Sequence, residues 1–462
     1  MKKYFITTFG CQMNKSDSER ISAKLKELGY QSAPDPSGAD LIVINMCSVR
    51  QSAVDRVYGR FNQFKKLKKQ NSNFKTLLTG CVLPSDLKKF KKYFNYILSI
   101  KTLPYWEQAL SKNHFYYYPS QRTQKFKTDY LKNTPCYQNN FSAYVPISIG
   151  CDNFCSYCVV PYTRGPLISR SSKDILAQIK NLVKKGFKEI WLIGENVNSW
   201  KVEKERNSRF NPPLTKSPPS LREGGREKER IGFPELLRMV NEIPGDFWIS
   251  FTSSHPKDFS DKLIKTMKQC AKVTDYISLP IQSGDNQVLK AMNRPYKVSD
   301  YKKIVKKIRK SIPDVYLSTD IIVGFPEETK KQFANTAKLF KELRFDMAYI
   351  AEYSPRRGTT AFKVKDNVSQ KEKQQRREIL TKILEKTAIA KNKKYIGKTI
   401  EVLISNVIKN KFLVGKTKNY KTVKIVDLPP QIKPQQMIGR IAKAKVIDII
   451  PWGLKAELES GW

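Results

Sequence analysis

The chain has 462 residues, enough for two to four domains and a large core. Hydrophobic residues make up 40% and aromatic residues 11% of it, which excludes a largely disordered protein. Lys and Arg number 85 against 42 Asp and Glu, a formal net charge of +43. Such an excess destabilises the folded chain through repulsion between like charges, so it is expected mainly in proteins that bind a polyanion. Nucleic acid is the leading candidate for that polyanion. The alternative is a lysine-rich composition without such a partner.

The N-terminal stretch MKKYFITTFGCQMN contains an apolar run that is too short and too polar for a signal peptide. No apolar stretch approaches the ~20 residues that a membrane-spanning helix needs. We therefore expect a cytoplasmic protein with no membrane association, and we expect it to be a monomer. Since thiols stay reduced in the cytoplasm, the eight cysteines indicate metal binding or catalysis before disulfides.

Three apolar runs in the first part of the chain end in a cysteine, at Cys11, Cys47 and Cys81. Helix-like segments such as residues 17–28 lie between these runs, a pattern typical of βαβ units with a parallel sheet. Because parallel strands bring their carboxyl ends to one edge, we expect the three cysteines to converge there. Three unrelated buried cysteines are the alternative.

Six strand-like runs, separated by helical patterns, follow between residues 144 and 386. This alternation predicts six consecutive βα units, a partial (β/α)6 barrel of parallel strands. The segment GCDNFCSYC, residues 150–158, directly follows the first run, so it should lie on the face where such barrels place their chemistry. Residues 201–230 are rich in proline, glycine and charge, and we expect them to be a disordered insertion.

Short β-branched runs with glycine turns begin near residue 396 and predict a small β-barrel. Lys and Arg outnumber Asp and Glu there, which favours RNA binding along a charged groove over a merely solvated surface. The fold class is therefore α/β. We expect an N-terminal parallel-sheet α/β domain at residues 1–125, the partial barrel at 137–387 and the small β-barrel at 392–460.

Cys151, Cys155 and Cys158 are separated by three and then two residues, and no fourth cysteine follows before Cys270. Zinc fits this set poorly, because it usually takes four ligands and the chain has only two histidines. Three thiolates can instead hold three irons of a 4Fe–4S cluster and leave the fourth iron open. An open iron of this kind suits the cleavage of S-adenosyl-L-methionine (SAM) to a radical.

The C-x3-C-x2-C spacing, with an aromatic residue before the last cysteine, resembles the radical SAM superfamily. The stretches TFGCQMNKSDSE, GCDNFCSYCVVPYTRG, LPIQSGDNQVLKAMNR, STDIIVGFPEET and EYSPRRGT resemble its methylthiotransferases, and the C-terminal barrel resembles their RNA-binding TRAM module. The resemblance covers nearly the whole chain outside residues 201–230. QMNKSDSE, CSVRQSA and VVPYTRG most resemble the MiaB-type enzymes, which act on isopentenylated adenosine at position 37 of tRNA.

The resemblance implies two 4Fe–4S clusters and SAM as cofactors. The implied ligands of the radical-generating cluster, which are also the catalytic residues, are Cys151, Cys155 and Cys158. The implied ligands of an auxiliary cluster are Cys11, Cys47 and Cys81. Cys136 and Cys270 match no ligand position and are expected to be structural.

The resemblance further implies a reaction and its partners. A methylthio group would be added to C2 of N6-isopentenyladenosine at position 37. The partners would be tRNA, an electron donor protein and a sulfur donor protein.

Five polar residues are candidates for contact with SAM: Glu195 and Asn196 after the second predicted barrel strand, Gln282 and Ser283 after the fourth, and Asp320 in the fifth. The family usually carries Gln where this chain has Glu195. Each of the five could instead be a capping or loop residue, because polar residues are common at strand ends.

Three other functions compete with this interpretation. One is methylthiolation of threonylcarbamoyladenosine in tRNA, and another is methylthiolation of an aspartate in a ribosomal protein. The third is a non-catalytic iron–sulfur RNA-binding protein. The basic terminal barrel argues against a protein substrate. The second set of three cysteines argues against a sensor, which needs neither an open iron nor two clusters.

Overall fold

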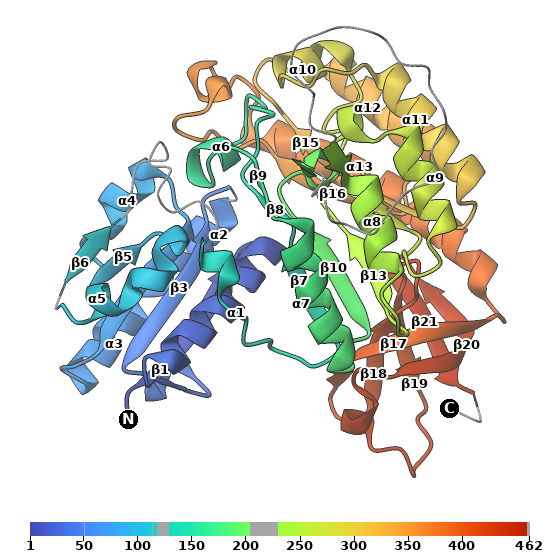
Figure 1. The fold of residues 1–462 in the computed structure, drawn as a ribbon. Coiled ribbons are helices and arrows are strands. Elements are labelled where there is room, and N and C mark those ends of the chain that lie inside the picture. The colour runs from blue at the N-terminus through green and yellow to red at the C-terminus, as the bar shows by residue number, and fades with distance from the viewer. Residues whose placement is uncertain (50, 113, 118–128, 204–229, 460–462) are drawn as a thin grey trace, which may run out of the picture.

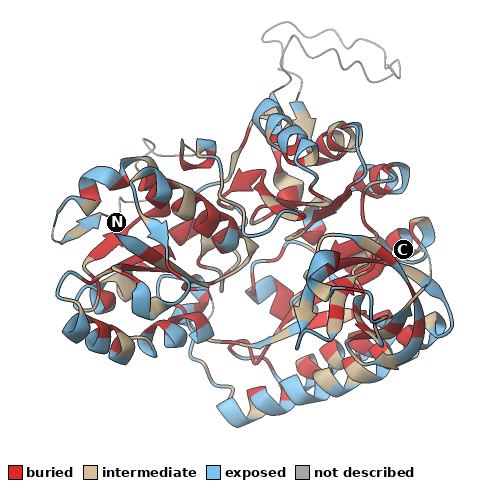
Figure 2. Ribbon diagram, turned by 90° about the horizontal axis from the view of Figure 1, so that it is seen from below, coloured by how far each residue is buried: buried red, intermediate tan, exposed pale blue. Residues whose placement is uncertain are grey.

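The computed structural model describes residues 1–49, 51–112, 114–117, 129–203 and 230–459. An N-terminal sheet domain, a partial barrel of parallel strands and a closed C-terminal β-barrel follow one another along the chain (Figure 1). Buried residues follow the strands of each part (Figure 2). The predicted α/β fold class is confirmed. None of the helices in the described ranges combines the length and the apolar character that crossing a bilayer requires.

The N-terminal domain is a six-stranded parallel sheet with the order β2-β1-β3-β4-β5-β6. Its strands are β1 (Lys3–Phe9), β2 (Gln31–Ser32), β3 (Leu41–Cys47), β4 (Lys75–Cys81), β5 (Tyr96–Leu98) and β6 (Phe115–Tyr117). One face packs on α1 (Gln12–Glu27) and α5 (Trp106–Leu110). The other packs on α2 (Gln51–Tyr58), α3 (Phe61–Gln70) and α4 (Pro84–Phe90). Helices cover both faces, which explains why β3 is buried along its whole length.

The barrel has six parallel strands whose spatial order follows the sequence. They are β7 (Ser142–Pro146), β10 (Glu189–Ile193), β13 (Trp248–Phe251), β14 (Tyr276–Ser278), β15 (Tyr316–Val323) and β16 (Met347–Glu352). A parallel bridge between Ile249 and Val273 joins the two halves. The six predicted strand-like runs are therefore confirmed.

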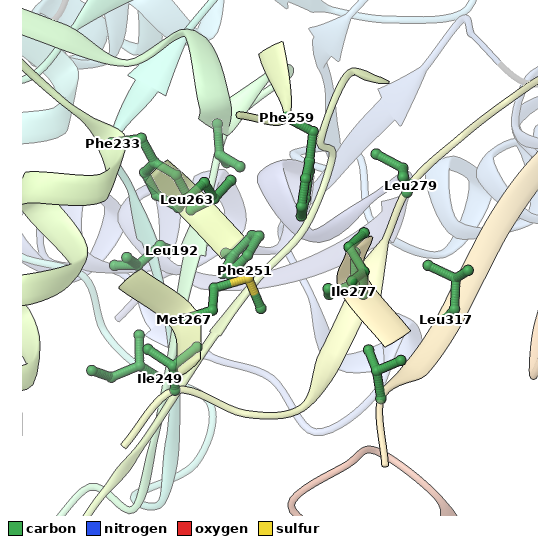
Figure 3. Packing of buried hydrophobic residues seen from close by; sticks show 14 of the residues in the cluster. Leu192, Phe233, Ile249, Phe251, Phe259, Leu263, Met267, Ile277, Leu279 and Leu317 are labelled. Carbon is green, nitrogen blue, oxygen red and sulfur yellow. The ribbon is translucent and has the colours of Figure 1, made fainter. Parts of the chain in front are cut away.

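Helices cover the outside of these strands (Figure 1). They are α7 (Ser172–Lys184), α8 (Phe233–Asn241), α9 (Asp261–Gln269), α10 (Asn286–Ala291), α11 (Val298–Ser311), α12 (Lys330–Leu343) and α13 (Gln370–Asn392). Figure 3 shows the core between strands and helices, where Ile249 and Phe251 of β13 share one apolar cluster with Leu263 and Met267 of α9. This apolar layer fixes the strand ends from which the site is built.

The insertion predicted at residues 201–230 differs from the expectation at its two ends. Lys201–Glu203 (β11) and Arg230–Gly232 (β12) pair as an antiparallel ladder instead of being disordered, because backbone hydrogen bonding closes the base of the insertion. Residues 204–229, and the domain boundary predicted at 125, lie outside the described residues.

The N-terminal domain packs along the β7 side of the partial barrel. Ser16 on α1 donates a hydrogen bond to the carbonyl of Tyr144 on β7, at 3.4 Å. One apolar cluster contains both Ile21 of α1 and Trp191 and Ile193 of β10. Shared burial of this kind holds the two sheets together, with the carboxyl ends of their strands on the same side (Figure 1).

The C-terminal barrel closes in the order β17-β18-β19-β21-β20 and confirms the predicted small β-barrel. Its strands are β17 (Thr399–Ile408), β18 (Phe412–Lys416), β19 (Thr422–Val426), β20 (Ile441–Ile450) and β21 (Gly453–Leu458). Leu403 packs on Phe141 and Trp248, which lie at the amino ends of β7 and β13. The small barrel therefore sits at the opposite end of the partial barrel from the cysteine segment (Figure 1).

The turn between β18 and β19 fills the amino end of the partial barrel. Tyr420 has a positive φ of 69° and places its ring 5.2 Å from Trp191 and 4.4 Å from Tyr276. Lys421 next to it donates to Asn392 at 2.8 Å. A bulky residue with positive φ is strained, so the packing around Tyr420 must compensate for that strain. This contact ties the small barrel rigidly to the domain that carries the site.

Candidate active site

Cys11, Cys47 and Cys81 lie at the carboxyl ends of three neighbouring strands. Cys47 and Cys81 end β3 and β4 and are paired in register. Cys11 lies two residues after β1 and is the N-cap residue of α1. The three thiols thus come together at one sheet edge, as the sequence predicts. Their role as cluster ligands stays a prediction.

Asn14, a fully buried residue of α1, connects these cysteines. Its side-chain oxygen accepts hydrogen bonds from the backbone nitrogen of Cys11, at 3.2 Å, and from the Cys11 thiol, at 3.5 Å. Its Nδ2 donates to Asn45 at 2.9 Å and lies 4.0 Å from the sulfur of Cys81. Gly80, with φ of 105°, allows β3 and β4 to lie this close, because a Cβ there would lie 2.2 Å from the Met46 carbonyl oxygen.

The second cysteine set lies in the loop that joins β8 (Ser148–Ile149) to β9 (Ile168–Ser169), which pair antiparallel. The base of this loop is closed by the Cys151 backbone nitrogen, which donates to the Gly165 carbonyl at 3.1 Å. Gly150 has a φ of 75°, and a Cβ there would lie 2.0 Å from the carbonyl oxygen of Pro166. The loop also contains the short helix α6 (Val160–Thr163). The three thiols are therefore held just beyond the end of β7.

Two other segments hold the far side of this cysteine loop. The backbone nitrogen of Ser156 donates a hydrogen bond at 3.0 Å to the carbonyl of Met292, which follows α10. The carbonyl of Ser156 accepts a hydrogen bond at 2.8 Å from the backbone nitrogen of Ala361, which follows β16. Asn293 donates its side-chain amide to the carbonyl of Phe154 at 2.9 Å. The loop is thus fixed to both halves of the barrel.

Burial makes most of these thiols difficult to ionise in the cluster-free protein. It raises the pKa of Cys151 to about 11 and that of Cys158 to about 12, and it also raises the pKa of Cys11. The hydrogen bond between Cys47 and Cys81 lowers the pKa of Cys47 and raises that of Cys81. Metal binding requires thiolates, so the bound irons must drive off these protons, and nearby cations help to stabilise the ionised form.

Each cysteine set has a buried arginine. Arg164 follows α6 and donates its Nε to the sulfur of Cys81 at 2.9 Å. Arg294 follows α10, and its Nη1 lies 3.6 Å from the sulfur of Cys155. The predicted site residues include neither arginine, although Arg164 lies in the stretch VVPYTRG and Arg294 in LPIQSGDNQVLKAMNR. Their position in those motifs is the signal that could have identified them.

Glu195 lies just beyond β10, between the two cysteine sets. Its Oε1 is 3.7 Å from Nε of Arg164. Burial raises its pKa to about 7, and both Cys11 and Cys151 lie close enough to Glu195 for its charge to raise their pKa values. The neighbouring Asn196 donates to Asp258 at 2.7 Å, which holds its side chain toward the loop after β13.

The other three candidates are Gln282 and Ser283, which follow β14, and Asp320, which lies within β15. Gln282 has a φ of 75° and its backbone nitrogen donates to the carbonyl of Asp320 at 2.9 Å, so these two lie side by side. Ser283 is fully buried, and its hydroxyl oxygen lies 3.5 Å from that of Thr336 on α12. Its hydroxyl therefore helps to hold α12. Contact of these residues with SAM stays a prediction.

Several buried polar atoms at this end of the barrel have no hydrogen-bond partner in the described structure. They belong to Ser148, Glu195 (Oε2), Asn196 (Oδ1) and His255 (Nε2). Buried polar atoms without partners are costly, so a polar ligand that satisfied them would gain affinity. Burial lowers the pKa of His255 to about 2, which keeps its ring neutral.

The two cysteine sets suit iron–sulfur clusters better than single ions. A single metal ion takes all of its ligands around one point, and zinc usually takes four of them. A 4Fe–4S cluster instead spreads its thiolates over different irons. Three thiols in each set, with an arginine directed at one sulfur, form a donor set that fits such a cluster.

Comparison with known proteins identifies all three parts of the chain. The family model of the Radical SAM superfamily matches residues 145–340, that of the Uncharacterized protein family UPF0004 matches residues 3–100, and that of the TRAM domain matches residues 393–458. A tRNA-2-methylthio-N(6)-dimethylallyladenosine synthase of Clostridium botulinum (strain Hall) is 37% identical over 463 residues, covering 98% of this chain and 96% of that one. The protein of the same name from Thermoanaerobacter sp. (strain X514) is 36% identical over 473 residues, covering 98% and 92%.

The chain belongs to this family of tRNA-2-methylthio-N(6)-dimethylallyladenosine synthases. Among solved structures, the radical S-adenosylmethionine methyltransferase TsrM from Kitasatospora setae is similar with a TM-score of 0.51 and 11% identity. That similarity covers 78% of this chain and 77% of TsrM, and it shows the fold alone. The predicted resemblance to MiaB-type radical SAM methylthiotransferases is therefore confirmed.

We expect Glu195→Gln to stabilise the cluster-free chain in a pH-dependent way. Because burial raises the pKa of Glu195 from its ordinary 4.5 to about 7, the folded chain binds a proton there that the unfolded chain has already lost. Stability therefore falls as the pH rises between these two values. The substitution should add about 3 kcal/mol to the free energy of unfolding at pH 8 and much less at pH 5.

Urea unfolding at the two pH values measures this difference. The matched control is Glu242→Gln, at an exposed position after α8, which should have little effect at either pH. An equal effect of Glu195→Gln at pH 5 and pH 8 would show that Glu195 is not held in a desolvated state.

Proposed function

We propose that this chain is a radical SAM methylthiotransferase that adds a methylthio group to C2 of N6-isopentenyladenosine at position 37 of tRNA. The observation that carries the proposal is the meeting of two three-cysteine sets where the N-terminal sheet and the barrel join. Near full-length similarity to synthases of that name supports the substrate. Cytoplasmic location and a monomeric state belong to the same proposal.

The proposed cofactors are SAM and two 4Fe–4S clusters. Cys151, Cys155 and Cys158 would hold the cluster whose open iron receives SAM. Cys11, Cys47 and Cys81 would hold the auxiliary cluster. When bound, these groups would supply two things: a 5′-deoxyadenosyl radical that abstracts hydrogen, and a sulfur that carries a methyl group. Unpartnered oxygen atoms of Glu195 and Asn196, near the cysteine loop, would accept hydrogen bonds from the ammonium group of SAM.

The protein itself contributes positioning and the exclusion of water. The adenine C2–H bond is not acidic, so general acid–base chemistry cannot readily break it, and His255, whose pKa burial lowers to about 2, is too weak a base to help. Helix α1 covers the β7 side of the barrel, and the Tyr420 turn fills its amino end. A reactive carbon held in a shielded space avoids competing hydrogen donors.

The C-terminal barrel supports an RNA substrate. On β20, exposed Lys443 and Lys445 alternate with buried Ala442 and Ala444, so the lysines form one outward face. This barrel and the cysteine loop lie at opposite ends of the partial barrel, so one substrate that contacts both must be large. A folded tRNA meets that requirement, and its phosphates match the charge of the chain. An electron donor and a sulfur donor protein would complete the cycle.

Iron analysis tests the two-cluster part of the proposal. After anaerobic reconstitution we expect about eight irons per chain, because each three-cysteine set binds one four-iron cluster. Cys81→Ser and Cys151→Ser should each lower the content by about half, whereas the control Cys136→Ser should not lower it. A wild-type content of about four irons would contradict two clusters.

Nucleoside analysis of tRNA tests the reaction. In cells that lack the gene, we expect isopentenyladenosine to accumulate without its 2-methylthio group. The wild-type gene should restore the modification, and a Cys151→Ala variant should not. An unchanged nucleoside profile on deletion would refute the proposed substrate, and loss of 2-methylthio-threonylcarbamoyladenosine instead would favour the related reaction.

A further inference from the structure

Arg164 brings a buried positive charge to the N-terminal cysteine set. Its side chain is 2% exposed, and its Nε donates to the sulfur of Cys81 at 2.9 Å. Its Nη2 donates a hydrogen bond to the carboxylate of Asp17 on α1 at 2.7 Å, and its Nη1 lies 3.5 Å from the hydroxyl of Tyr130. The guanidinium is thus a fixed donor to one proposed cluster ligand, with a carboxylate as its counter-ion.

Arg294 occupies the corresponding place in the barrel set but has different partners. Its Nη1 lies 3.6 Å from the sulfur of Cys155 and 3.2 Å from the hydroxyl of Tyr157. Its Nη2 donates to the carbonyl of Pro280 at 2.8 Å, and its Nε donates to Tyr296. Within the described ranges, no carboxylate lies within ion-pair distance of Arg294. The positive charge is therefore buried without an anionic partner in the cluster-free chain.

A buried cation without a counter-ion is expensive unless an anion is supplied. A cluster held by three thiolates is such an anion, and one-electron reduction makes it more negative. A nearby guanidinium therefore favours the reduced form and raises the reduction potential. Because Asp17 offsets the charge of Arg164 and nothing comparable offsets Arg294, the Arg164–Asp17 pair should raise the potential of its cluster less than Arg294 raises that of the other cluster.

We propose that Arg164 and Arg294 are positioning residues that set the reduction potentials of the two iron–sulfur sites separately, Arg164 through Cys81 and Arg294 through Cys155. This inference rests on the two-cluster function proposed above. The couple in question is [4Fe–4S]2+ accepting one electron from dithionite to give [4Fe–4S]+. No proton or other co-reactant is needed.

The test is a redox titration of reconstituted full-length protein, followed by EPR. Each cluster is observed alone in a background in which the other three cysteines are replaced by Ala. Arg164→Gln should make reduction of the N-terminal cluster about tenfold less favourable, a shift of about 59 mV for one electron. It should leave the barrel cluster unchanged. Arg294→Gln should likewise make reduction of the barrel cluster about tenfold less favourable and leave the N-terminal cluster unchanged.

Three further variants separate tuning from a structural role. Arg164→Gln leaves Asp17 buried without its partner, so the double variant Arg164→Gln/Asp17→Asn is tested beside it. Arg164→Lys keeps the charge and should recover part of the shift. Arg170→Gln is the matched control, because Arg170 is a buried arginine that donates to Pro146 and Gln178 and to no cysteine. It should shift neither potential.

Several outcomes would overturn the inference. One is an unchanged potential in the arginine variants that retain wild-type iron content. A second is an equal shift of both clusters by either variant. A third is loss of the cluster from every arginine variant, including Arg164→Lys, which would indicate a role in assembly instead of tuning. Wild-type protein that binds only one cluster would refute the proposed function itself, a result that iron analysis distinguishes from the other three.

Discussion

The contact between Arg164 and Cys81 connects the two halves of this molecule that carry its chemistry. The guanidinium comes from the cysteine loop of the barrel and reaches the last residue of a strand in the N-terminal sheet. A buried cation must be matched by anions or acceptors, and Asp17 from α1 supplies one. This contact can form only when both sheets present the carboxyl ends of their strands on the same side. The docking of α1 along β7 and the shared apolar cluster achieve that arrangement.

The sequence was sufficient for the features that depend on local pattern. Six apolar runs predicted the six barrel strands, and three apolar runs ending in cysteine predicted the convergence of Cys11, Cys47 and Cys81. These predictions succeed because the pattern of apolar residues identifies the strands. A cysteine that ends such a run then lies at the edge where parallel strands end. The small terminal barrel was predictable for the same reason.

The sequence was not sufficient for contacts between distant segments. Arg164 and Arg294 contact sulfur atoms that lie 83 and 139 residues away along the chain, and no periodicity reports such pairs. Asn14 precedes the helix-like segment predicted at residues 17–28 and was assigned no role, yet it connects Cys11 to Cys81. Ser283 illustrates the opposite case, because its position at a strand end suggested a cofactor contact while its hydroxyl lies against Thr336 on α12. Side-chain direction follows from tertiary packing, which a local pattern does not encode.

The central claim is that both three-cysteine sets bind clusters close to one another across the Arg164 contact. The most direct measurement is the EPR spectrum of dithionite-reduced protein with both sets intact, compared with the sum of spectra from two variants that each lack one set. Two paramagnetic clusters held this close should couple, so the account predicts a split or broadened spectrum that the sum does not reproduce. A spectrum identical to the sum, with both clusters present and reduced, would contradict the account.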